Sequence, residues 1–116
     1  MAVITTAKPL ILTQYAENSA TTEYTTPSST KTLIDSFIAT NISGGAITLT
    51  IYLVTSGGSV GDSYKVLDAL SIASKASVTI DIMKNQYLEP GDFISVFASG
   101  GSSIVIRCSG REVVTS

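Results

Sequence analysis

Residues 31–54, KTLIDSFIATNISGGAITLTIYLV, decide the fold of this chain. Two runs rich in Ile, Leu, Thr and Phe flank a short polar segment, Ser43-Gly44-Gly45. Every other residue from 47 to 53 is Ile or Leu, and this two-residue period is typical of a strand with one buried face. The paired glycines offer the positive φ angles of a tight turn. The stretch therefore predicts a β-hairpin, with Leu49, Ile51 and Leu53 in the core.

Similar signals recur toward the C-terminus. Alternation over residues 76–83 predicts a strand, and Glu89-Pro90-Gly91-Asp92 predicts a type II turn. Gly100-Gly101 predicts a second hairpin, which leads into a last strand over 103–114. Residues 62–74 fit both a helical stripe and broken strands, and we favour extended structure there. About seven to nine short strands with frequent turns predict an all-β fold, an antiparallel β-sandwich of jelly-roll or Ig-like type.

The chain of 116 residues has the length of one domain. Its first thirty residues are less regular, with candidate strands at 9–16 and 21–26 separated by loop-like segments. We expect residues 1–30 to form either an edge of the chain's own sheet or an arm that contacts a neighbouring subunit. Residues 31–116 are expected to form the sandwich core.

The composition argues against several classes of partner. Only 14% of the residues are charged and the net charge is −2, so there is no basic surface to bind nucleic acid or an anionic membrane. No apolar run approaches the roughly 20 residues that span a bilayer. The N-terminus lacks the pattern of a signal peptide, which leads us to expect synthesis in a cytoplasm. The mean hydropathy of +0.37 predicts apolar surface buried in the fold or against other subunits.

The sequence contains little catalytic chemistry. Without histidine there is no Ser-His-Asp triad or Cys-His dyad, and one cysteine cannot supply a zinc site. The loop Gly57–Gly61 lacks the Lys-Ser/Thr ending of a phosphate-binding loop. We therefore expect no enzyme, no catalytic residue, no cofactor and no bound metal.

Carboxylates are the remaining resource for chemistry. Asp62, Asp68, Glu89 and Asp92 follow loops, where they would serve as an acid pair or as calcium ligands if the fold brought them together. The simpler interpretation is that Asp62 and Asp92 cap turns. Asp35 falls inside a strand, on the expected face of Leu33 and Phe37, and Arg107 or Arg111 is its expected ion-pair partner.

Three further groups of residues have structural interpretations. Cys108 continues the face of Ile104 and Ile106, which predicts a buried and inert thiol. Asn41 is interpreted as a residue that flanks a turn. Among the tyrosines, Tyr15, Tyr24, Tyr64 and Tyr87 are candidate contacts with other proteins, because tyrosine buries a large ring and keeps a polar tip; packing in the core is the alternative.

Three segments together resemble a known group of proteins: YTTP at 24–27, LIDSFIATNISGGAITLTIYLV at 33–54, and LEPGDFISVFASG at 88–100. They are similar to small β-sandwich proteins encoded in the virion gene clusters of tailed bacteriophages, over roughly residues 22–112. The resemblance implies a capsid decoration (cement) protein, or a head-tail or tail accessory protein. Such proteins are usually oligomeric.

The resulting expectation is a structural protein of a phage particle, made in the bacterial cytoplasm and located in the virion. Its expected partners are itself, preferably as a homotrimer, and the major capsid protein or tail proteins. The alternatives are a tail or neck component, or a module that recognises host-surface carbohydrate or protein through its loop tips. Asp62, Tyr64, Asn85 and Tyr87 would then be contacts.

Overall fold

The computed structural model of the chain describes residues 3–115. It contains nine strands and two short 3-10 helices. In chain order these are β1 (Val3–Tyr15), β2 (Thr21–Thr25), β3 (Thr30–Asn41), β4 (Ile47–Val54), η1 (Asp62–Tyr64), β5 (Lys65–Ile72), β6 (Ser77–Thr79), η2 (Asp81–Met83), β7 (Tyr87–Leu88), β8 (Phe93–Ala98) and β9 (Ile104–Thr115).

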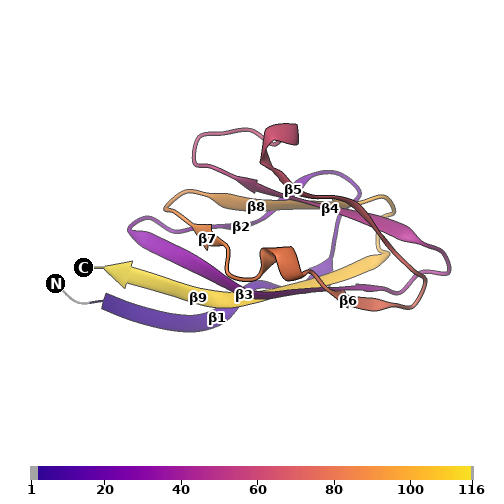
Figure 1. The fold of residues 1–116 in the computed structure, drawn as a ribbon, viewed down its shortest axis with the longest axis horizontal. Helices are drawn as coiled ribbons and strands as arrows, with labels where there is room; N and C mark the ends of the chain where they lie inside the picture. Colours follow the sequence, from indigo (N-terminus) through magenta and orange to yellow (C-terminus); the bar gives the residue numbers. More distant parts are fainter. Residues whose placement is uncertain (1–2, 116) are drawn as a thin grey trace.

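The strands form two antiparallel sheets that pack face to face (Figure 1). The first sheet has the order β1-β9-β3-β6, with β7 pairing to another part of β3, and the second has the order β2-β8-β4-β5. Taking β6 and β7 as two pieces of one interrupted strand, this is the eight-stranded arrangement of a jelly roll. The predicted all-β antiparallel sandwich is confirmed.

The predicted hairpin at 31–54 is wrong in its pairing, although its strands are where the sequence indicates. β3 belongs to the first sheet and β4 to the second, so the chain crosses between sheets at 42–46. β4 instead pairs with β5, the next strand along the chain. A strand, a polar turn and a second strand with one apolar face describe a hairpin and a sandwich corner equally well, because both bury one face.

The crossing is held by an asparagine side chain and not by glycine geometry. Neither Gly44 nor Gly45 has a positive φ. The buried amide of Asn41 donates to the carbonyl oxygens of Gly45 and Ile72, both at 2.8 Å. Its oxygen accepts from the backbone N–H of Ser43 at 2.9 Å. Asn41 therefore flanks the turn as predicted, and it also ties the end of β3 to the second sheet.

The second predicted hairpin, at Gly100-Gly101, is wrong for the same reason, since β8 lies in the second sheet and β9 in the first.

The predicted strand over 76–83 is correct only at its start. β6 ends at Thr79, and the 3-10 turn of η2 rotates the chain so that Met83 is buried while Ile82 is exposed. The expected extended structure at 62–74 is largely confirmed by β5, and the turn at Glu89 has the expected Gly91 with φ +87°.

A bulge in β3 sets which side chains enter the core. The register between β3 and β9 shifts between Ile34 and Ser36, so that Thr32 and Ile34 point inward before it and Phe37 and Ala39 after it. An unbroken alternation predicted that Asp35 and Phe37 share one face of the strand. Because of the bulge, they lie on opposite faces, and this prediction is wrong. Leu49 and Ile51 are fully buried as predicted, and Leu53 is partly buried against the core.

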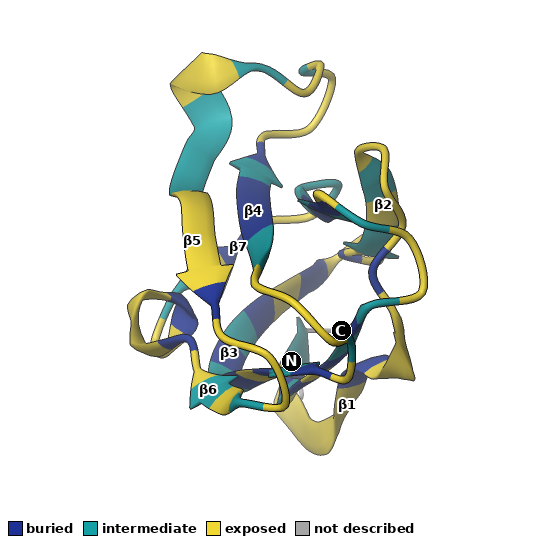
Figure 2. Cartoon of the chain, turned by 90° about the vertical axis from the view of Figure 1, so that its right-hand side faces the viewer, coloured by how far each residue is buried: buried dark blue, intermediate teal, exposed yellow. Residues whose placement is uncertain are grey.

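The first thirty residues belong to the sandwich of their own chain. β1 pairs with β9 along the edge of the first sheet, and β2 pairs with β8 along the edge of the second. Most of β1 is nevertheless exposed, which Figure 2 shows as a yellow strand, with Leu10 and Ile11 buried. Contact of this segment with a neighbouring subunit remains a prediction.

Candidate functional site

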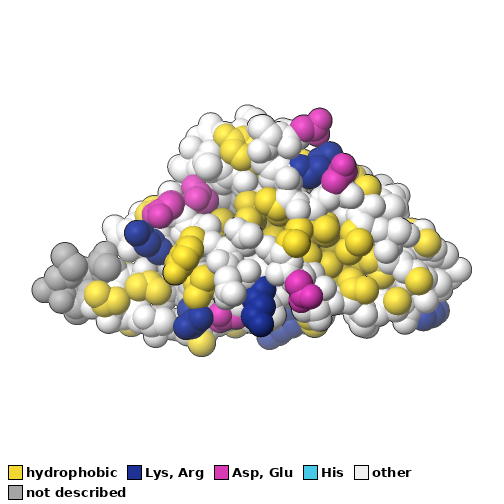
Figure 3. Space-filling model, in the orientation of Figure 1, with side chains coloured by type: hydrophobic (Ala, Val, Ile, Leu, Met, Phe, Trp, Pro, Cys, Tyr) yellow, Lys and Arg dark blue, Asp and Glu magenta, His cyan; other side chains and the backbone are white. Residues whose placement is uncertain are grey.

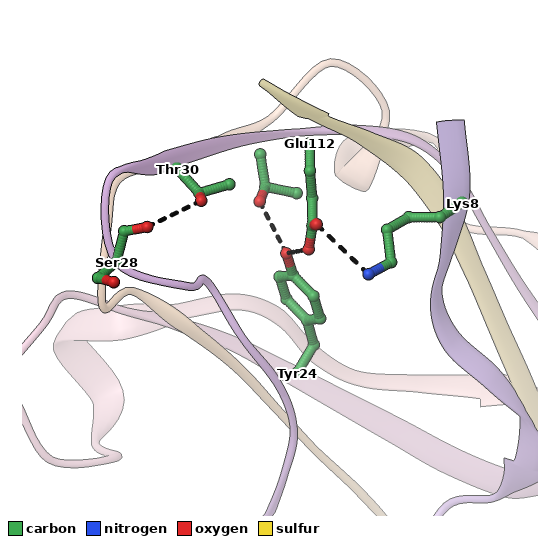
Figure 4. A network of polar contacts seen from close by, with 6 residues as sticks. Lys8, Tyr24, Ser28, Thr30 and Glu112 are labelled. Atoms are coloured by element: carbon green, nitrogen blue, oxygen red, sulfur yellow. Dashed lines mark hydrogen bonds and ion pairs between the residues drawn. The ribbon is translucent and has the colours of Figure 1, made fainter. Parts of the chain in front are cut away.

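A cluster of polar side chains lies between the two sheets, where β1, β2, β3 and β9 meet (Figure 4). The Tyr24 hydroxyl donates to Oε2 of Glu112 at 2.5 Å. The Thr32 hydroxyl lies 2.8 Å from the Tyr24 oxygen and is the donor to it, because the single tyrosine proton points at the carboxylate. Lys8 Nζ lies 3.3 Å from Oε1 of Glu112.

This cluster is closed on itself. Burial and the hydrogen bond to Glu112 raise the pKa of the Tyr24 hydroxyl, so the ring stays protonated at neutral pH. The Glu112 carboxylate is satisfied by one hydroxyl and one ammonium group, and the contact joins four strands from both sheets. We interpret the cluster as structural. A signal for Glu112 is present in the sequence, because this residue continues the two-residue period of Ile106, Cys108 and Gly110 at the inward-facing positions of the last strand.

Cys108 and Asp35 behave as single structural residues. Burial, with a smaller effect of the Asp35 charge, raises the pKa of the Cys108 thiol to about 12, which confirms a buried thiol with little thiolate at neutral pH. Asp35 forms a two-pronged ion pair with Arg111, at 2.9 and 3.2 Å, whereas Arg107 donates to the Thr13 hydroxyl.

The four candidate tyrosines do not lie together. Tyr15 is exposed at the end of β1, and Tyr24 is held between the sheets by the polar cluster. Tyr64 lies in η1, where its hydroxyl accepts from Thr55 at 2.9 Å. Tyr87, in β7, is 71% exposed. Of the four, Tyr15 and Tyr87 are the ones that the structure leaves available for a partner.

The loop carboxylates are also dispersed. Asp62 and Asp68 both pair with Lys65, at 3.2 and 3.3 Å, and raise its pKa. Asp92 accepts from the backbone N–H groups of Ser56 and Glu89, which fits the predicted turn cap for this residue. Residues 3–115 contain no group of three or more His, Cys, Asp or Glu side chains placed to hold a metal ion.

One further carboxyl group has a shifted pKa. Glu23 occupies the bulge of β2, and partial burial together with the charge of Glu17 raises its pKa. Its Oε2 is buried without a hydrogen-bond partner among residues 3–115. Glu17 itself is exposed on the loop before β2.

The molecule has a shallow hollow of about 490 Å³ beside β7. It is lined by Lys31, Tyr87, Glu89 and Val113. Lys31 Nζ lies 3.8 Å from Glu89 Oε1, and both side chains are mostly exposed. The hollow therefore combines one aromatic ring with one cation and one anion that are open to solvent.

The same side of the molecule carries an apolar band, which Figure 3 shows across its middle. Leu70 in β5 and Ile82 in η2, on elements that contact each other, are both exposed. No helix in the described part of the chain has the length and apolar character to cross a membrane.

Comparison with known proteins supports the fold alone. No protein-family model matches the chain, and no curated protein matches it. A solved structure described as "Bacillus endospore appendages form a novel family of disulfide-linked pili" is similar, with a TM-score of 0.58 and 16% sequence identity. The similarity covers 98% of this chain and 89% of the other.

Proposed function

We propose that this chain is a non-enzymatic structural protein of a bacteriophage particle, a capsid decoration protein that binds the assembled shell. It is made in the bacterial cytoplasm and ends in the virion. It acts as a homo-oligomer, and a trimer suits the three-fold positions of a shell. The partner is the major capsid protein.

One observation carries the proposal: the polar cluster between the sheets and the ion-paired or turn-capping carboxylates make contacts that stabilise the fold. Tyr24, Thr32 and Glu112 bond to one another between the sheets, and Asp35 and Asp92 satisfy an arginine and a turn. Among the exposed residues, Ser and Thr and the apolar side chains each outnumber the charged ones. Such a surface suits protein contacts better than catalysis.

The architecture agrees with this interpretation. Jelly rolls are used in viral capsid domains. The similar solved structure is described as belonging to pili, which are assemblies of protein subunits. Many weak identical contacts are sufficient on a particle, because multivalency raises the overall affinity.

Binding to the shell is tested directly. Purified protein is mixed with undecorated capsids of the phage that encodes it, and the particles are imaged by cryo-electron microscopy. We expect added density at positions that repeat with the symmetry of the shell. Particles with no added density at saturating protein would contradict the decoration role, and density on the tail or neck would support the accessory role instead.

The hollow beside β7 favours one second candidate, recognition of carbohydrate at a host surface. An exposed ring such as Tyr87 stacks on the apolar face of a sugar, while Lys31 and Glu89 offer a donor and an acceptor to its hydroxyls. Asp62 and Tyr64 lie in η1, over the second sheet, and do not line this hollow (Figure 1). A glycan array tests the idea: binding that is lost in Tyr87→Ala and kept in Tyr15→Ala would support it, and an array without signal would reject it.

A further inference from the structure

The outer edge of β1 is a long strand edge without a neighbour. One edge of β1 pairs with β9, and no strand among residues 3–115 lies along the other. From Val3 to Pro9 the register with β9 is unbroken, and every one of these residues is exposed. A regular strand of this kind presents a row of unpaired backbone N–H and C=O groups, which is a template for pairing with another chain.

The other edges of the two sheets are protected. β2 has five residues and a bulge at Glu23, and β6 and β7 have three and two residues. β5 is longer, but its pairing with β4 shifts register twice and Ala69 has a positive φ of 49°. Short length and irregularity are two of the means by which proteins prevent strand edges from pairing; lysine and proline on the edge are others, and β1 has these at Lys8 and Pro9. β1 is neither short nor irregular over its first seven residues.

The side chains of β1 also favour contact. The strand VITTAKPLILTQY contains one charged residue, Lys8, and it exposes the β-branched Val3 and Ile4 by 62% and 58%. In Figure 1 the free ends of β1 and β9 extend beyond the second sheet. Ile4 lies opposite Val114, two residues after the inward-facing Glu112, so this apolar pair is on the inner face where the second sheet does not cover it.

We propose that residues 3–7 of β1 pair antiparallel with the same residues of a second copy of this chain, about a two-fold axis that is normal to the sheet and passes between the two Thr5 residues. The two first sheets then become one continuous sheet. Such an axis keeps the faces matched, so that Ile4 of each copy stays on the inner side and approaches the body of the other copy. The two Lys8 side chains lie at opposite ends of the contact and do not repel one another.

A second copy is the occupant that the molecule itself indicates. Among the free strand edges in the described part of the chain, that of β1 is the long and regular one. The edge that matches it in length and regularity is therefore the same edge of a second copy. The net charge of −2 costs little when two copies meet. The contact deepens the self-association in the proposed function: it gives a dimer in solution, or a hexamer where it joins two trimers, so the number of copies is even.

The test is the mass in solution, measured by light scattering after size exclusion over a dilution series. We expect an even multiple of the 12.1 kDa chain at high concentration and dissociation on dilution. The blocking variant is Thr5→Pro. Proline in an edge strand has its nitrogen toward solvent, and Thr5 shares the orientation of the natural Pro9 through the two-residue period, so this change spares the pairing with β9. Thr5→Ala is the matched control, because it removes the same hydroxyl and keeps the N–H.

We expect Thr5→Pro to raise the dissociation constant of the dimer about tenfold or more, and Thr5→Ala to change it little. A wild-type monomer or trimer at every concentration would overturn the proposal, as would equal weakening by both variants. Hydrogen exchange of the wild type needs no variant: the amides of Thr5 and Ala7 should exchange more slowly at high concentration, and unchanged rates would also overturn it. If the protein is a monomer that still binds capsids, the contact through β1 is rejected and the capsid role stands. If it is an even-numbered oligomer that does not bind capsids, the capsid role is rejected and the contact through β1 stands.

Discussion

At the scale of single residues, Gly110 is the position where the fold allows no side chain. A Cβ placed on Gly110 would lie 2.3 Å from the carbonyl oxygen of Leu33 and 2.8 Å from Cδ1 of Leu10. The first of these atoms is backbone of the neighbouring strand β3, so it cannot move without shifting the sheet. Close approach of two backbones, and not a positive φ, is therefore the reason for glycine here.

Gly110→Ala is accordingly expected to lower the free energy of unfolding by about 1–3 kcal/mol, the usual cost of overpacking. Urea unfolding followed by circular dichroism measures it. Gly44→Ala is the control, because nothing lies within 4 Å of its Cβ position and its φ is not positive. Equal stability of the two variants would show that β3 and β9 separate easily at this point.

The buried thiol predicts how stability depends on pH. The folded chain holds the Cys108 proton up to a pKa of about 12, while the unfolded chain loses it near the ordinary value of 9.0. Between these values the unfolded state binds fewer protons, so the free energy of unfolding falls as pH rises and is unaffected by this group below pH 9. One such group contributes a slope of about 1.4 kcal/mol per pH unit.

Urea unfolding of the wild type and of Cys108→Ala from pH 8 to 11 isolates this contribution. The variant is less stable at pH 8 because it lacks a buried sulfur, but its stability should decline less steeply above pH 9. Tyr24 titrates in both proteins and cancels in the comparison. Parallel curves would mean that the thiol is not protected in the folded state.

At the scale of elements, the crossing from β3 to β4 depends on Asn41. Its buried amide donates to the carbonyl of Gly45 within the crossing and to that of Ile72 in β5, and removal of the side chain takes away the bond that this amide makes to the buried end of β5. Asn41→Ala should lower the free energy of unfolding by about 1–3 kcal/mol. Ser43→Ala, which removes an exposed hydroxyl of the same turn, should cost less. Similar costs for the two variants would contradict the role given to Asn41.

The same crossing explains what could be predicted from the sequence. Strands are local features, so alternation located β3, β4 and β9 and placed Cys108, Leu49 and Ile51 in the core. Pairing is not local: the partner of β3 is β9, more than sixty residues away along the chain. The polar turns at 43–45 and 100–101 resemble hairpin turns in sequence. The residues of such a turn do not indicate whether the next strand joins the same sheet or the opposite one.

The polar cluster was missed for a related reason. Tyr24, Thr32 and Glu112 meet only after three strands from two sheets are assembled, so the inward-facing position of Glu112 in the last strand did not by itself identify its partners. Conversely, the candidate tyrosines share a residue type but no location. The bulge at Asp35, which reverses the inward and outward positions of β3, has no signature in the alternation itself.

At the scale of the whole molecule, the first and last strands pair with each other along the edge of the first sheet. The polar cluster then ties β1 and β9 to β2 and β3, so the N-terminal thirty residues share contacts with the rest of the sandwich. A segment integrated in this way cannot leave without opening the core, because Leu10 and Ile11 of β1 are buried in it. We therefore expect residues 10–30 to unfold together with residues 31–115.

Native-state hydrogen exchange in low urea tests this expectation. Amides in the buried part of β1 that pair with β9 should open with the same free energy as those of β3 and with the same dependence on urea, because a single cooperative transition exposes both. The exposed end of β1 before Lys8 is the internal control. It lies beyond the second sheet and should exchange by local fraying whenever the protein is dilute (Figure 1). If the amides around Ile11 instead opened at a much lower free energy than those of β3, residues 1–30 would behave as a separate arm, and their place in the sandwich would depend on a neighbouring subunit.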